Sequence, residues 1–198
     1  LQRVRHDLET RAYTYEKEDH RMLVIFDTGD ILELLRDRSI RFYLARMLAS
    51  FVRINSYSYS VRVRTGVWRR YRFSDFDLES MLRLSERVEE SKRFAVYRRI
   101  ADVCLFSTGV FSDYVRARYD LPGSKFQRFA STFGTGFERI EDYGRHFYRK
   151  AGEHEVAREG EMDQVLLELS KKFGLASKPL SFMADHYLGS MRTKVFLQ

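Results

Sequence analysis

The sequence contains very little cysteine and proline. Among its 198 residues there is one cysteine, Cys104, and there are two prolines, Pro122 and Pro179. A single cysteine cannot form an internal disulfide and fits a reducing compartment, so we expect Cys104 to pack as a small apolar residue in a cytoplasmic protein. The scarcity of proline argues against linkers and turn-rich all-β folds, and it favours long helices.

The sequence also lacks a long apolar run. A membrane-spanning helix needs roughly 18 uninterrupted apolar residues. The best candidate, residues 31–54, is interrupted by charged side chains at Arg36, Asp37, Arg38, Arg41 and Arg46. We therefore expect a soluble protein that makes no membrane contact.

Motifs for hydrolysis or nucleotide binding are missing as well. There is no Gly-x-Ser-x-Gly turn, no His-Glu-x-x-His pair and no phosphate-binding loop. Residues Asp27-Thr28-Gly29 match the tripeptide of aspartic proteases, but a helical pattern follows them, so we expect Asp27 or Thr28 to cap a helix instead. The sequence predicts no catalytic residue and no cofactor, and a binding role is favoured over an enzymatic one.

The apolar residues that are present favour helices. Hydrophobic residues make up 44% of the chain, which excludes disorder, and they recur at steps of three and four. The sequence predicts one mainly α domain over residues 1–198, a compact multi-helix bundle with one inserted β-hairpin. Helices are expected at residues 30–53, 78–90, 97–107 with a bend at Gly109, within 124–152 as two helices, 156–173 ended by Gly174 as a left-handed cap, and 177–191.

The hairpin is predicted at about residues 57–73, where apolar and polar residues alternate. A loop at Arg64-Thr65-Gly66 with Gly66 in the left-handed region would place Tyr59 opposite Tyr71 and Val63 opposite Val67. Because an isolated hairpin is marginally stable in water, we expect its apolar face, which includes Val67, to lie on the helices.

Positive charge is concentrated in this hairpin. The chain has a net charge of +7, and six arginines but no aspartate or glutamate lie between Arg53 and Phe73. Arginine pairs with phosphates and carboxylates, and aromatic rings accept bases, so the sequence predicts binding to nucleic acid or to an acidic protein. The alternative is an Arg-rich solvated strand pair, or one that pairs with acidic residues of the helix at 78–90. The candidate binding residues are Arg62, Arg64, Trp68, Arg70 and Arg72.

One carboxylate, Asp102, lies inside the most apolar part of the chain. A buried charge is costly unless it is paired, and Arg98 and Arg99 are at helical spacing from it. We expect these three residues to form a polar centre of the core that fixes how the helices pack.

The alternative hypothesis is a metal-dependent enzyme of the helical-bundle type, in which Asp102 would be a metal ligand. Carboxylates and histidine on facing helices hold iron or manganese in some bundles, and the set here would be Asp102, Glu138, Asp142 and His146. The diagnostic Glu-x-x-His pair is absent, and ion pairs within one helix explain the same residues. A third hypothesis is a structural subunit that forms homodimers through aromatic surfaces.

Three short patterns are found along the chain. Their residues are Arg99, Asp102, Leu105, Phe106, Gly109 and Phe111, then Asp142, Tyr143, Phe147 and Tyr148, and finally Ala184, Asp185, Tyr187 and Leu188. Together these patterns resemble a family of uncharacterised, largely helical prokaryotic proteins, although Ala101 and Ser112 stand where glycine and proline are expected. The resemblance covers roughly residues 30–190 and implies a compact helical fold without an established activity.

Overall fold

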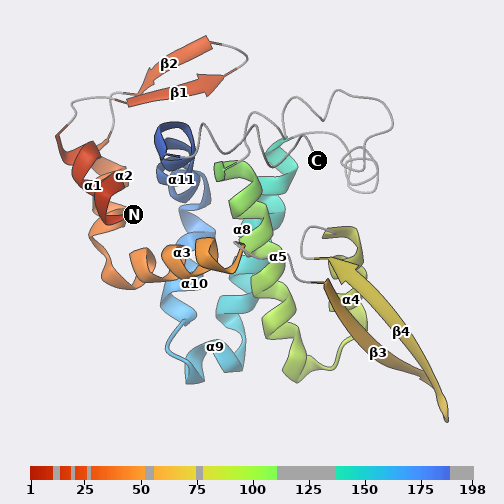
Figure 1. The fold of residues 1–198 in the computed structure, drawn as a ribbon. Coiled ribbons are helices and arrows are strands. Elements are labelled where there is room, and N and C mark those ends of the chain that lie inside the picture. The colour runs from red at the N-terminus through yellow and green to blue at the C-terminus, as the bar shows by residue number, and fades with distance from the viewer. Residues whose placement is uncertain are drawn as a thin grey trace.

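The structure is a computed structural model in which helices pack around a central helix (Figure 1). It describes residues 1–10, 14–18, 21–25, 28–51, 56–74, 78–110 and 137–187. The protein is mainly α, as predicted. The elements are α1 Gln2–Glu9, β1 Thr14–Glu18, β2 Arg21–Ile25, α2 Gly29–Arg36, α3 Arg38–Ser50, β3 Ser56–Arg64, β4 Val67–Ser74, α4 Leu78–Arg87, α5 Glu90–Val110, α8 Phe137–Glu153, α9 Glu155–Glu159, α10 Asp163–Lys171 and α11 Phe173–Tyr187.

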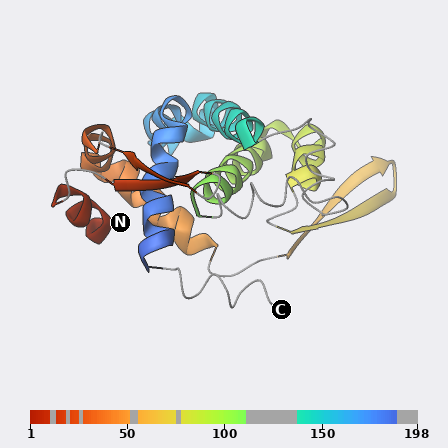
Figure 2. The ribbon, with the colours of Figure 1, turned by 90° about the horizontal axis from the view of Figure 1, so that it is seen from above.

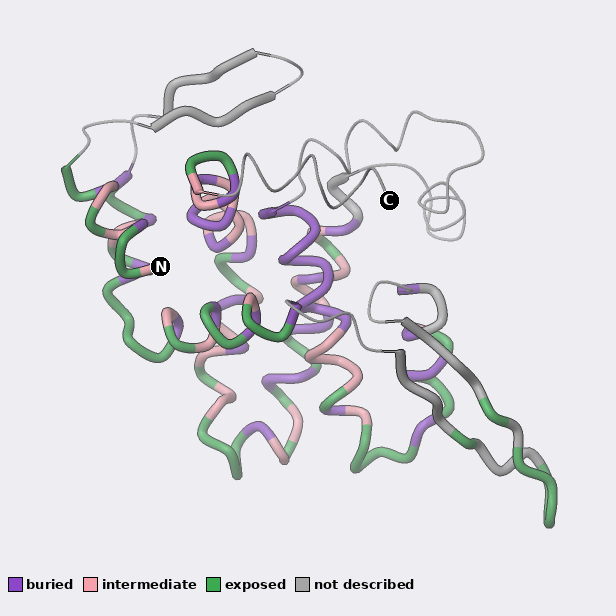
Figure 3. Tube along the Cα trace, viewed as in Figure 1, coloured by how far each residue is buried: buried purple, intermediate pink, exposed green. Residues whose placement is uncertain are grey.

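The central helix is α5. All of its residues from Ile100 to Val110 are buried, and Figure 3 shows this half of the helix in continuous purple. It packs chiefly against α8 and α11, and less extensively against α4. A helix that is buried all round needs apolar residues on every side, and the run from Val103 to Phe106 supplies them. The predicted central element is therefore confirmed, but it is longer than expected.

Gly109 does not bend this helix. The helix continues to Val110, and a Cβ atom at position 109 would lie 2.7 Å from the Cβ atom of Leu180 on α11. The missing side chain therefore serves a close helix contact, not the bend that was predicted. Gly144 on α8 likewise allows a close contact with α11, because a Cβ atom at position 144 would lie 2.1 Å from the ring of Phe173.

The long helix predicted for residues 30–53 is broken into α2 and α3. Asp37 has extended backbone between them, and its carboxylate accepts hydrogen bonds from the backbone N–H groups of Ser39, at 2.7 Å, and Ile40, at 3.2 Å. This is an N-cap. Arg41 donates back to the carbonyl oxygen of Arg36, at 2.8 Å, at the end of α2. The apolar spacing continues across both helices, so periodicity alone did not reveal the break. Thr28 occupies the N-cap position of α2 but makes no side-chain cap bond, and Asp27 lies outside the described residues.

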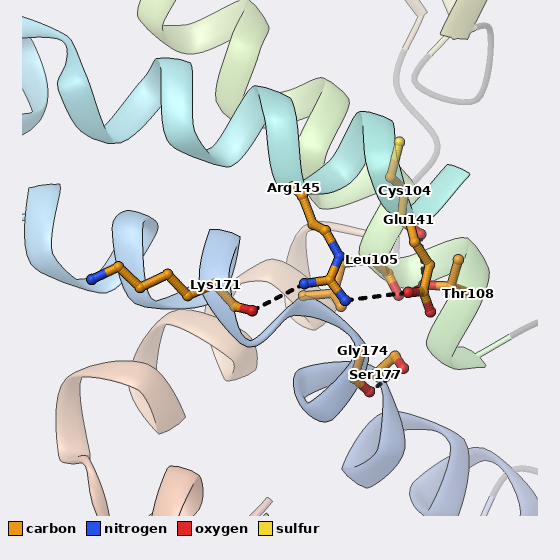
Figure 4. A network of polar contacts seen from close by, with 8 residues as sticks. All are labelled: Cys104, Leu105, Thr108, Glu141, Arg145, Lys171, Gly174 and Ser177. Atoms are coloured by element: carbon orange, nitrogen blue, oxygen red, sulfur yellow. Dashed lines mark hydrogen bonds and ion pairs between the residues drawn. The ribbon is translucent and has the colours of Figure 1, made fainter. Parts of the chain in front are cut away.

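The C-terminal helices also begin and end at other residues than predicted. The segment 156–173 is divided into α9 and α10, with Glu161 between them at a positive φ of 53°. Gly174 is not a left-handed cap; it lies inside α11. Figure 4 shows why α10 can end earlier, at Lys171: Arg145 of α8 donates to the carbonyl oxygen of Lys171 at 3.0 Å. A Cβ atom on Gly174 would lie 3.4 Å from the same guanidinium, which is an ordinary van der Waals contact, so the packing does not require a glycine here.

Two hairpins accompany the helices in the part of the chain that the structure describes. The pair β3–β4 lies where a hairpin was predicted, whereas the pair β1–β2 was not predicted. No helix in the described ranges is both long enough and apolar enough to cross a membrane. The predicted turn between helices within residues 124–136 lies outside the described residues.

Candidate functional site

The hairpin β3–β4 has the register that the sequence predicted over most of its length. Tyr59 is opposite Tyr71, and Arg62 is opposite Trp68. Gly66 has a φ of +79°, the left-handed conformation that the turn requires. The pairing is irregular only next to the turn, where Arg64 is opposite Val67 and Val63 has no partner.

This irregularity changes which residues share a face of the ribbon. Residues paired across two strands lie on the same face, and neighbours along a strand lie on opposite faces. Arg64 therefore shares a face with Val67, while the opposite face carries Trp68 and Arg70. The predicted pair of Val63 and Val67 is wrong, and an arginine takes the place of Val63 at the end of the apolar face.

The described side chains near the turn are exposed on both faces. Trp68 is 64% exposed and Val67 is 54% exposed, and Arg64 and Arg70 are exposed beside them. The expectation that Val67 would be covered by helices is therefore wrong. The side chains of Arg62 and Arg72 lie outside the described residues, although their backbone positions belong to the face of Trp68 and Arg70.

The ribbon projects away from the helices (Figure 1), and Figure 2 shows the same projection from above. In the described part of the chain neither strand packs extensively on a helix. The two faces near the turn are thus open to a ligand.

Acidic residues of the neighbouring helices do not neutralise the described arginines of the hairpin. Glu89 pairs with Lys92 at 3.0 Å, and Glu90 pairs with Arg93. Within the described residues, Arg64 and Arg70 form neither an ion pair nor a hydrogen bond. Their charge remains available for a partner.

The buried carboxylate of Asp102 is held by two tyrosines. The hydroxyl group of Tyr43 on α3 donates to Oδ1 at 2.7 Å, and the hydroxyl group of Tyr148 on α8 donates to the same oxygen at 2.9 Å. Desolvation raises the pKa of Asp102 from 3.8 to about 6, and the two hydrogen bonds and the charges of Arg98 and Arg99 oppose that rise. Burial and the neighbouring carboxylate raise the pKa of both tyrosines. These three residues join α3, α5 and α8 at one point of the core.

Arg98 and Arg99 act on Asp102 through their charge, and their guanidinium groups lie on aromatic rings. That of Arg98 lies 5.5 Å from the ring centre of Phe94, and that of Arg99 lies 4.0 Å from the ring centre of Phe51. Arg99 also donates to the hydroxyl group of Ser50 at 2.7 Å. Asp102 and the two arginines were predicted from the sequence, whereas the two tyrosine donors were not. The need of a buried carboxylate for O–H or N–H donors could have indicated the two tyrosines. A tyrosine can supply such a donor from an otherwise apolar helix face.

The described side chains of the candidate metal site, those of Asp102, Asp142 and His146, are not gathered into a cluster. Asp142 is exposed and His146 is partly buried on α8, whereas Asp102 is enclosed by its tyrosines. The side chain of Glu138 lies outside the described residues. Among the side chains that are described, no three histidine, cysteine or acidic residues are placed to hold a metal ion. Burial lowers the pKa of His146, and burial raises that of Cys104, which packs in the core.

The chain matches no protein-family model, no curated protein and no solved structure. Its resemblance to a helical prokaryotic family stays a prediction. Two features of the structure therefore bear on function, the projecting hairpin and the enclosed carboxylate. The carboxylate is surrounded by protein, whereas the hairpin is accessible.

Proposed function

We propose that this protein binds nucleic acid through the exposed turn end of the β3–β4 hairpin and has no catalytic role. The observation that carries the proposal is the combination of Arg64, Trp68 and Arg70, all exposed on a ribbon that projects from the helices. Arginine binds phosphate through bidentate hydrogen bonds, and an exposed indole ring can stack on a base. The protein acts in the cytoplasm, where a reduced cysteine and nucleic acid occur together.

Charge supports nucleic acid as the ligand. The segment from Arg53 to Phe73 carries six arginines and no acidic residue, so a polyanion meets no repulsive group along it. Exposed arginines are common on protein surfaces and need no aromatic neighbour to stay hydrated. The large exposed indole among them is therefore the feature that favours a ligand over a merely solvated surface. An acidic protein would be attracted by the same charges, and the test below separates the two ligands.

The test is a salt titration of binding to fluorescently labelled oligonucleotides, followed by anisotropy. Affinity should fall steeply between about 50 and 200 mM salt, because bound protein releases counterions from the phosphates. The double variant Arg64→Ala with Arg70→Ala should bind more weakly and reduce the slope of log K against log salt by about 1.4 on single strands. The matched control, Arg149→Ala with Arg158→Ala, removes two exposed arginines from α8 and α9 and should behave as wild type.

Trp68 provides a second readout because it is the only tryptophan of the chain. Its fluorescence reports on the hairpin alone and should be quenched when a base stacks on it. Absence of binding at about 50 mM salt, or equal losses in the hairpin variant and its control, would refute the proposal. Quenching by an acidic peptide but not by oligonucleotides would assign the surface to a protein partner.

A further inference from the structure

A second exposed aromatic residue lies on α3. Phe42 is 64% exposed, and the guanidinium group of Arg46 lies 5.7 Å from its ring centre. Arg38 is exposed one turn earlier on the same side. The opposite side of α3 is buried through Ile40, Leu44 and Met47. The exposed side of α3 therefore repeats the combination of an aromatic ring and arginine found near the hairpin turn.

This side of α3 and the hairpin belong to one basic stretch of the chain. Residues 38–73 contain nine arginines and no aspartate, glutamate or lysine. Among the described residues, the large hydrophobic side chains that are exposed are Phe42, Val67 and Trp68, and all three fall in this stretch. Exposed apolar groups and uncompensated positive charge thus coincide on the same two elements.

The arrangement of the elements allows one ligand to reach both. In Figure 1, α3 begins beside α2 and runs toward the middle of the bundle, so its last turn is its part nearest to β3–β4 and a ligand that reaches Phe42 must extend along the helix. The view from above in Figure 2 agrees. A helix of 13 residues is about 20 Å long and a strand of nine residues is about 30 Å long, so the two surfaces together match a strand of several nucleotides.

Two separate aromatic rings indicate what kind of nucleic acid fits. In a duplex the faces of the bases are covered by their neighbours, and only base edges are exposed in the grooves. A single strand presents base faces, which stack on aromatic side chains while arginines contact the backbone. Rings at Phe42 and Trp68 fit the second case, because each is exposed with arginine beside it.

We infer that the ligand is a single-stranded nucleic acid that runs from the hairpin turn, at Trp68, onto the exposed side of α3, at Phe42. The inference rests on the proposed nucleic-acid binding and adds a second contact surface and the class of ligand. The stack at Phe42 adds affinity only for a strand long enough to reach both rings.

The first test uses the α3 variant Phe42→Ala with Arg46→Ala and single strands of about five and about fifteen nucleotides, which span the range of known site sizes. Wild type should bind the long strand more tightly than a duplex of equal length. The α3 variant should lose about 5- to 150-fold in affinity for the long strand, the range that one stacked base covers. Its affinity for the short strand, measured by quenching of Trp68, should equal that of wild type.

Two results would overturn the inference while leaving the proposed function intact. One is wild-type affinity of the α3 variant for the long strand, in an assay where the Arg64 and Arg70 variant has lost binding. The other is a duplex that binds as tightly as the single strand. No binding of any oligonucleotide by wild type would instead overturn the proposed function itself.

Moving the tryptophan from the hairpin to α3 tests whether the ligand contacts α3 directly, while an aromatic ring is kept at both positions. The variant Phe42→Trp with Trp68→Phe places the only tryptophan on α3. Its fluorescence should be quenched by the long strand, and unchanged fluorescence under saturating binding would refute contact at this position.

Discussion

Replacing Asp102 with asparagine should change how the stability of the protein depends on pH. The carboxyl group is buried, and desolvation raises its pKa from 3.8 to about 6. Between these two pH values the folded protein keeps a proton that the unfolded chain has already released. The free energy of unfolding contributed by this group is therefore fully present below about pH 3.8 and is lost as the pH rises to about 6.

The size of the effect follows from the same two values. One pH unit corresponds to about 1.4 kcal/mol, so the rise of the pKa from 3.8 to about 6 amounts to about 3 kcal/mol over the whole range. About 2 kcal/mol of this falls between roughly pH 4.5 and pH 7, where unfolding experiments are practical. Asparagine does not titrate, and its carbonyl oxygen can still accept the two tyrosine hydroxyl groups.

The assay is urea unfolding of wild type and Asp102→Asn, followed by the circular dichroism of the helices at several pH values. Other titrating groups contribute equally to both proteins, so the difference between them isolates Asp102. As the pH rises from about 4.5 to 7, the free energy of unfolding of wild type should fall by about 2 kcal/mol relative to that of the variant. A constant difference, or a relative gain by wild type, would show that the tyrosine hydrogen bonds and the arginine charges balance or outweigh desolvation, and it would refute the reasoning.

Two further substitutions test the core. Tyr148→Phe removes a 2.9 Å hydrogen bond to the carboxylate and should destabilise the protein by about 1.5–3 kcal/mol at neutral pH, and by less near pH 4.5, in the same urea assay; equal losses at both pH values would contradict a charged acceptor. Gly109→Ala brings a Cβ atom to 2.7 Å from that of Leu180 and should cost about 1–3 kcal/mol in urea unfolding. The control Ser60→Ala, on the exposed hairpin, should leave stability within about 0.5 kcal/mol of wild type, and a Gly109→Ala variant as stable as this control would argue against the close contact of α5 and α11.

Structural features that depend on a repeating pattern within a short segment could be predicted from the sequence. The alternation at residues 57–73 predicted the hairpin, its pairing of Tyr59 with Tyr71 and the left-handed Gly66, because these depend on neighbours along the chain. The apolar run around Cys104 likewise predicted a buried central helix. The arginine-rich character of the hairpin needed no structure at all.

Helix ends were harder to predict because they depend on single contacts. Asp37 interrupts an unbroken apolar period by capping α3, and the carbonyl oxygen of Lys171 accepts from Arg145, which is 26 residues earlier in the chain. Gly109 and Gly174 were interpreted as a bend and a cap because glycine often serves these roles. In the structure Gly109 makes room for Leu180 of α11, and Gly174 lies inside a helix without a steric need for glycine. No local pattern distinguishes these cases from a bend or a cap.

The sequence by itself determined that the chain is mainly helical, that it carries a basic aromatic hairpin, and that a carboxylate lies in the core. The tertiary structure decided what that carboxylate meets and which rings remain exposed. Tyr43 and Tyr148 are 59 and 46 residues from Asp102, and they reach it only because α3 and α8 pack against α5. Trp68 and Phe42 stay exposed because no described helix covers them. Local periodicity fixes which segments form helices or strands, whereas contacts between distant segments depend on packing that periodicity does not encode.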